Sequence, residues 1–148
     1  MDQIKLTASS SINGKIKLPG SKSLTNRILL LASLGEGEIL IKKPLFSDDT
    51  NYMISALEQL GINIKINKDD ILINGSCGNF PIKNKDLFLG NAGTAFRPLT
   101  ACLALNYGNY KLKGIERMHE RPIKDLIIAL QQLGAEIKYL KNDGFPPI

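Results

Sequence analysis

The residues best suited to chemistry in this sequence stand where a glycine-containing loop leads into an expected helix. The segment LPGSKSLTNR, residues 18–27, passes Gly20 and continues with Lys22, Ser23 and Arg27. A helix N-terminus presents free backbone N–H groups and a partial positive charge, which attract anions. Ser23 and Arg27 are one helical turn apart and share a face. The pattern predicts a phosphate or carboxylate site made by a hydroxyl, an ammonium and a guanidinium.

A second segment of the same kind lies further along the chain. GNAGTAFR, residues 90–97, has a glycine at Gly93, where a ligand can come close to the backbone, and a hydroxyl at Thr94. Arg97 takes the place that Arg27 has in the first segment. A third anion-binding candidate is Arg121, which directly precedes a proline at the start of another expected helix and can make bidentate contacts to phosphate or carboxylate.

Each of these features also has a purely structural interpretation. LPGSKS is a plausible loop with a helix cap, GNAGTA is a plausible turn against a neighbouring helix, and a single arginine beside a proline is often just exposed. We expect Asp48 and Asp49 to cap a helix and not to form a catalytic acid pair. Because two related helix starts and a further arginine recur in one basic chain, the sequence favours anion binding.

The composition indicates which kinds of anionic partner the chain could bind. The formal net charge is +5 and the pI is about 9.2, which suits nucleic acid, an acidic membrane or a phosphorylated metabolite. Aromatic residues make up only 6%, tryptophan is absent, and the lysines are dispersed, so nucleic acid is the weaker interpretation. The longest apolar stretch, Ile28 to Leu34, is too short to span a bilayer, and no secretory signal is present, so we expect a cytoplasmic protein.

The two cysteines suggest neither a metal site nor a disulfide framework. Cys77 and Cys102 have no further Cys or His at metal-ligand spacing, and His119 is the one histidine. We expect Cys102 to be a buried, inert thiol and Cys77 to lie in an exposed turn.

An internal repeat organises the chain. Besides the two helix starts, GEILIK at 37–42 aligns with GNYKLK at 108–113, and ALEQLG at 56–61 aligns with ALQQLG at 129–134. Each copy has the pattern of a helix, a strand, a second helix and one or two strands, which predicts a duplicated α/β unit. The expected helices cover 22–35, 50–60, 93–106 and 122–133, with Pro122 in the first turn of the last, and the expected strands cover 38–42, 62–66, 71–75, 109–113 and 135–140.

The two ends of the chain differ from this body. IKLTA at 4–8 and GKIKLP at 14–19 predict a hairpin that turns at Asn13-Gly14. The chain stops just after the last expected strand without a capping element, which is typical of a truncated repeat array.

Four segments together resemble one known family. LPGSKSLTNR, SDDT at 47–50, LFLGNAGTAFRPL at 87–99 and ERMHERPI at 116–123 are similar, in order and spacing, to the signature segments of 5-enolpyruvylshikimate-3-phosphate synthases. The resemblance implies an inside-out α/β barrel of two domains, each built from three βαβαββ units whose helix N-termini face a cleft. Residues 1–20 would then be a hairpin of the other domain, and residues 21–148 would be two repeat units of the shikimate-3-phosphate-binding domain.

The resemblance also implies roles for individual residues. Those expected to bind shikimate-3-phosphate are Lys22, Ser23 and Arg27. Those expected to bind phosphoenolpyruvate are Lys22, Asn91, Gly93, Thr94 and Arg121. Arg97 and Pro98 would support the site without touching substrate. The family's acid and base groups come from the other domain, so we expect no catalytic residue on this chain, and no metal or organic cofactor.

The implied reaction adds the shikimate hydroxyl to the enolpyruvyl carbon of phosphoenolpyruvate and then expels phosphate, in aromatic amino acid biosynthesis. The expected partners are these two substrates and the missing C-terminal domain, in a monomer. An alternative is the related UDP-N-acetylglucosamine enolpyruvyl transferase, which has Ala-Lys-Asn where this chain has Ser21-Lys22-Ser23 and a cysteine where it has Glu116. A nucleic-acid-binding domain built on the same repeat is the alternative from another class.

Overall fold

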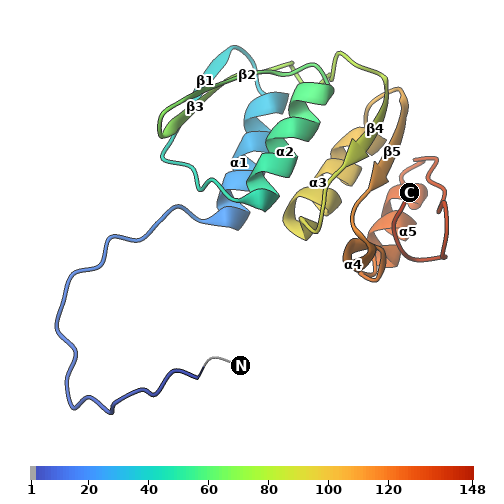
Figure 1. The fold of residues 1–148 in the computed structure, drawn as a ribbon. Helices are drawn as coiled ribbons and strands as arrows, with labels where there is room; N and C mark the ends of the chain where they lie inside the picture. The colour runs from blue at the N-terminus through green and yellow to red at the C-terminus, as the bar shows by residue number, and fades with distance from the viewer. Residues whose placement is uncertain (1–2) are drawn as a thin grey trace.

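The computed structural model describes residues 3–148, which form the duplicated α/β arrangement that the repeat predicts (Figure 1). The first half contains α1 (Lys22–Leu34), β1 (Glu38–Lys42), α2 (Asp48–Gln59), β2 (Asn63–Asn67) and β3 (Asp70–Asn74). The second half contains β4 (Asn84–Phe88), α3 (Gly93–Ala104), β5 (Asn109–Lys113), α4 (Glu116–His119) and α5 (Lys124–Gln132). Both halves therefore run helix, strand, helix, which confirms the expected α/β class.

Two small sheets flank the helices. β1, β3 and β2 form an antiparallel sheet in that order, with Ile73 opposite both Ile39 and Ile64. β4 and β5 pair in parallel, with Leu87 opposite Leu112. Side chains alternate between the faces of a strand, and the inward-facing residues of each sheet are buried against the helices.

The core lies between the three long helices and these sheets. α1 packs against both α2 and α3, and the three helices lie side by side in Figure 1. Leu29, Met53, Leu57, Phe96 and Leu99 supply large side chains that are almost fully buried there. The N-terminal ends of all three helices lie at the same end of this layer (Figure 1), so the packing brings together the loops that precede them. No helix among residues 3–148 is both long and apolar enough to cross a membrane.

The helix ends differ from expectation in detail. The N-cap of α2 is Ser47, whose N–H donates to Thr50 Oγ1 at 2.8 Å while the Thr50 hydroxyl donates to the Ser47 carbonyl at 2.9 Å. The prediction that Asp48 or Asp49 caps this helix is wrong, because both stand in its first turn, where the helix dipole favours carboxylates. α5 likewise begins after Pro122 instead of including it.

The expected N-terminal hairpin is not formed. Residues 3–20 contain no strand, and apolar side chains along them are more than 80% exposed: Ile4, Leu6, Ile12, Ile16 and Leu18. A two-stranded hairpin is marginal in water unless its apolar face packs on something. Within the described chain this segment runs away from the helices (Figure 1) and has no such surface.

The expected strand at 135–140 is also absent, because β5 pairs with another segment. The N–H of Leu112 donates to the Ile148 carbonyl at 2.9 Å, and the N–H of Ile148 donates back to Leu112 at 3.1 Å. Leu140 instead donates to the Pro147 carbonyl at 2.8 Å. Residues 135–140 thus close a loop beside β5 and form no ladder of their own.

Candidate anion-binding site

The first residue of α1, Lys22, places its ammonium beside the start of α2. Ser21 caps the helix by accepting a hydrogen bond from the Leu24 N–H at 3.4 Å. Lys22 Nζ lies 2.9 Å from the Asp49 carboxylate in the first turn of α2, and both side chains are partly exposed. The ion pair therefore holds the ammonium between the N-termini of α1 and α2, where solvent still reaches it.

The other two α1 candidates share one helix face, as their spacing predicts. Ser23 is half-buried and Arg27 is exposed. Among residues 3–148, no carboxylate lies within 4.0 Å of the Arg27 guanidinium. A hydroxyl and an unneutralised guanidinium therefore stand one turn apart, available to a ligand.

The start of α3 holds a second cation in a defined position. Arg121 Nη1 donates to the Asn91 backbone carbonyl at 2.9 Å and approaches Asn91 Oδ1 at 3.3 Å. A Cβ atom added at Gly93 would lie 2.9 Å from the Arg121 guanidinium, so only glycine leaves room for this arrangement. The guanidinium thus lies against the N-terminus of α3, where both would attract the same anion.

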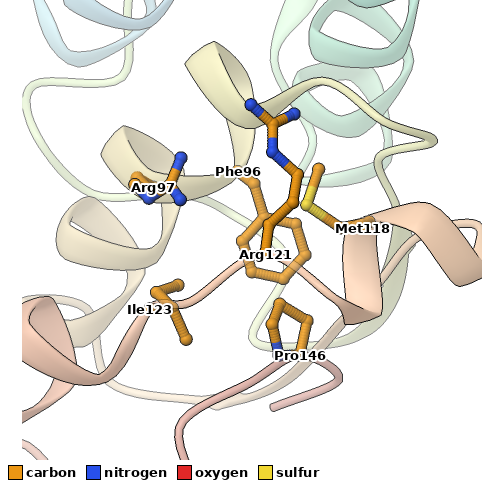
Figure 2. Close-up of a pocket in the computed structure, with 6 residues that line it drawn as sticks. All are labelled: Phe96, Arg97, Met118, Arg121, Ile123 and Pro146. Carbon is orange, nitrogen blue, oxygen red and sulfur yellow. The ribbon is translucent and has the colours of Figure 1, made fainter.

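Arg97 supports this arrangement from the side. Its Nη2 donates to the Pro122 carbonyl at 2.9 Å, which ties α3 to the residue after Arg121. Figure 2 shows the Arg121 side chain passing Phe96 and Met118, with its guanidinium on the far side from Ile123 and Pro146. The crevice that these residues line has an empty volume of only about 150 Å³. The part of Arg121 nearest the backbone lies beside this crevice, and its guanidinium points away from it.

Two contacts join the helix starts to one another. The Asn26 amide on α1 donates to Thr94 Oγ1 on α3 at 2.9 Å. Gly90, with φ of +52°, lets the loop before α3 approach the Tyr52 ring on α2, because a Cβ there would lie 2.1 Å from that ring. The candidate residues of α1 and α3 are therefore connected within one end of the helix layer.

The sequence-based reasoning gave no role to Asn26, Tyr52 or the Lys22–Asp49 pair. Asn26 stands inside the LPGSKSLTNR segment, one turn before the apolar positions Leu29 and Leu30, and that spacing was the available indication. No sequence pattern indicated the role of Tyr52, because its contact with Gly90 depends on how the loop before α3 packs against α2.

Other features lie apart from these residues. An open groove with a volume of about 1110 Å³ runs along β4, β5 and residues 134–138 and includes none of the candidate residues. Cys77 is exposed as expected, whereas Cys102 is half-buried, and burial raises the pKa of its thiol. The candidate site is thus an open surface with cations at its edge, suited to binding and orienting anions.

Comparisons with known proteins concern the sequence and the fold of the chain. The family model of EPSP synthase (3-phosphoshikimate 1-carboxyvinyltransferase) matches residues 6–148. A 3-phosphoshikimate 1-carboxyvinyltransferase of Cupriavidus necator is 54% identical over all 148 residues, and one of Paraburkholderia phymatum is 53% identical. The chain spans 34% of the length of each of these relatives.

A solved structure supports the same assignment. An EPSP synthase from Acinetobacter baumannii superposes with a TM-score of 0.82 and 26% sequence identity, over 90% of this chain and 31% of that one. The family match over nearly the whole chain, the sequence identity to curated relatives and this shared fold lead to one conclusion: the chain belongs to the EPSP synthase family and corresponds to about a third of a family member.

Proposed function

We propose that this chain supplies the anion-binding helix starts of an enzyme that transfers the enolpyruvyl group of phosphoenolpyruvate to the 5-hydroxyl of shikimate-3-phosphate. The observation that carries the proposal is the Arg121 guanidinium held against the start of α3, at the same end of the helix layer as the start of α1, whose first residue is Lys22. Two polyanionic substrates need several cations around one cleft, and this surface supplies them.

Each substrate has its own group of residues in this proposal. Shikimate-3-phosphate is bound by Lys22, Ser23 and Arg27, and phosphoenolpyruvate is bound by Lys22, Asn91, Gly93, Thr94 and Arg121. Lys22 is placed in both groups from the family resemblance, and the ion pair with Asp49 holds its ammonium near the starts of α1 and α2. An ammonium offers three donors, so it can bind a phosphate oxygen while it keeps the carboxylate contact.

The chain's contribution to the reaction is binding and orientation. The shikimate oxygen forms a bond to the central carbon of the enolpyruvyl group and loses its proton, while the methylene carbon gains one. The phosphate–carbon bond then breaks, the methyl group returns a proton, and the double bond forms again. Cationic groups fixed before the reaction stabilise the departing phosphate without reorganising. The acid and base groups are proposed to lie on the remainder of the enzyme.

The relatives also bear on the two alternatives. Those reported above carry the shikimate enzyme's name, and no observation favours the UDP-N-acetylglucosamine enzyme or a nucleic-acid-binding domain. We further propose that residues 21–148 are two units of the shikimate-3-phosphate-binding domain and that residues 1–20 pack on the other domain. A monomeric state, a cytoplasmic location and the absence of nucleic acid or membrane partners stay predictions from the sequence.

The proposal can be tested by titrating the 148-residue chain with shikimate-3-phosphate and following amide shifts by NMR. One phosphate contact at about 4 Å gains roughly 4 kcal/mol at an effective dielectric near 20, before desolvation and ordering costs. Because the surface is open, we expect a Kd no tighter than about millimolar, weakening as added salt screens the charges.

The matched variants Arg27→Ala and Arg97→Ala separate a specific site from general basicity. Each removes one charge from equivalent positions of the repeat, but Arg97 is engaged with the Pro122 carbonyl. We expect Arg27→Ala to weaken binding about fivefold more than Arg97→Ala does, the value of roughly one charged hydrogen bond. With both variants shown to be folded, equal losses would withdraw the role of Arg27.

A further inference from the structure

One buried polar side chain crosses between the two groups of anion-binding residues. Asn26 on α1 is fully buried, and its Nδ2 donates to Thr94 Oγ1 on α3 at 2.9 Å, 68 positions away in the sequence. Among residues 3–148, this is the one side-chain hydrogen bond that joins α1 to α3.

Core packing alone does not account for an amide at this position. Asn26 Oδ1 is buried and has no hydrogen-bond partner within residues 3–148. A buried acceptor without a partner is destabilising, whereas leucine of similar size would avoid that cost. The neighbouring buried positions Leu29 and Leu30 are apolar. Asn26 therefore costs stability that the fold could avoid, and its one observed contact is the Thr94 hydroxyl.

The location of this contact indicates what it does. Asn26 precedes Arg27, and Thr94 follows Gly93, against whose backbone the Arg121 guanidinium lies. The hydrogen bond therefore fixes the first turn of α3 relative to the helix face that carries Arg27. Because the Asn26 amide donates, Thr94 Oγ1 accepts, and its own proton remains free to donate to an anion.

We propose that Asn26 is a positioning residue that fixes the start of α3 against α1 and thereby sets the spacing of the two anion-binding groups. The inference deepens the proposed function and rests on it for the identity of the ligand. Asn26 contacts no substrate in this proposal and acts through Thr94 and the neighbouring backbone of Gly93.

The test uses four variants of the 148-residue chain, followed by amide NMR with and without phosphoenolpyruvate. Asn26→Leu and Thr94→Val each remove the hydrogen bond from one side, and the double variant completes a cycle. Thr100→Val is the matched control, because Thr100 is on the same helix and its buried hydroxyl donates to the Phe96 carbonyl at 2.9 Å.

In the chain without ligand, Asn26→Leu is expected to shift the Gly93 and Thr94 amide resonances and to speed their hydrogen exchange about fivefold, as expected for losing one hydrogen bond. Thr100→Val should leave both amides in place. Phosphoenolpyruvate should bind Asn26→Leu about fivefold more weakly, and the double variant should bind no more weakly than Thr94→Val. The thermal midpoint of Asn26→Leu should not fall below that of Thr100→Val, because leucine removes an unpaired buried acceptor, so a general loss of stability does not explain the difference.

The outcomes separate the positioning role from the proposed function. If the Gly93 amide is unchanged in Asn26→Leu, or moves equally in Thr100→Val, the positioning role is wrong. If the amide moves but the unaltered chain does not respond to phosphoenolpyruvate, the positioning role stands and the ligand assignment fails. Should Asn26→Leu not fold, Asn26→Ala gives the same comparison, because it removes the same hydrogen bond and leaves the Thr94 hydroxyl in place.

Discussion

At the start of α3, the missing side chain of Gly93 decides where a cation can lie. The Arg121 guanidinium reaches the Asn91 carbonyl at 2.9 Å across the space that a Cβ would occupy. The glycine allows this close approach, and a larger residue would make the flexible end of the Arg121 side chain shift. The sequence predicted that another group can come close to the backbone at Gly93. It could not show that this group is the Arg121 guanidinium.

We predict that Gly93→Ala weakens phosphoenolpyruvate binding more than shikimate-3-phosphate binding. The new methyl group would lie 2.9 Å from the guanidinium, so Arg121 must move away from Asn91. Losing a charged hydrogen bond of this kind corresponds to about a tenfold loss in affinity. NMR titrations of the 148-residue chain with each substrate measure this, and equal losses for the two substrates would contradict the division of the site.

Contacts within one helix were predictable from the sequence, whereas contacts between helices were not. The spacing of Ser23 and Arg27 predicted a shared helix face, because that geometry is local. The Lys22–Asp49 pair and the Asn26–Thr94 bond join residues of different helices and follow only from how those helices pack. Asp49 was predicted to cap a helix, yet Ser47 holds that position and the aspartate is left to bind Lys22.

Among the elements, helices were more predictable than strands. The expected ranges for α1, α2 and α3 agree with the structure to within two residues at either end, because apolar periodicity and terminal glycines are local properties. β4 was missed, since NKDLF is short and charged and pairs with a strand more than twenty positions away. The alternating segment at 135–140 was expected as a strand, but β5 pairs with Ile148 instead.

The loop before α3 offers a test of how the helices are held together. Gly90 has φ of +52° and an added Cβ would lie 2.1 Å from the Tyr52 ring, whereas Gly37 has φ of +73° and open space around it. We predict that Gly90→Ala lowers the free energy of unfolding by about 3 kcal/mol and Gly37→Ala by about 1 kcal/mol, because both incur backbone strain but one adds a clash. Urea denaturation measures both. Equal losses would mean that Tyr52 moves aside freely.

For the molecule as a whole, the exposed surfaces differ between the N-terminal segment and the candidate site. Apolar side chains along residues 3–18 are exposed, and the candidate site has cations on one side of an open surface. The chain spans about a third of the length of its relatives. The fold class was predictable from the internal repeat. The expected hairpin was wrong for the described residues, because an alternating pattern favours paired strands only where their apolar face packs on something, and the apolar side chains here are exposed.

We therefore predict that the 148-residue chain alone has no detectable transferase activity. Closure of a cleft around both substrates, with acid and base groups in place, is needed for the chemical step. The assay is release of phosphate from phosphoenolpyruvate in the presence of shikimate-3-phosphate. Turnover by material shown to be free of host enzyme would contradict the assignment of those groups to the remainder of the protein.

The central claim, that these helix starts bind the substrates of a carboxyvinyl transferase, is tested most directly in a hybrid enzyme. In the hybrid, this chain replaces the matching third of the Cupriavidus necator relative. We expect the hybrid to turn over both substrates, and Arg121→Ala to lower kcat/KM about a hundredfold, the size of losing one preorganised donor. Arg117→Ala is the matched control, because it removes a nearby charge whose partner is Glu120, and it should retain activity. A folded hybrid without turnover, or one equally active with Arg121→Ala, would contradict the account.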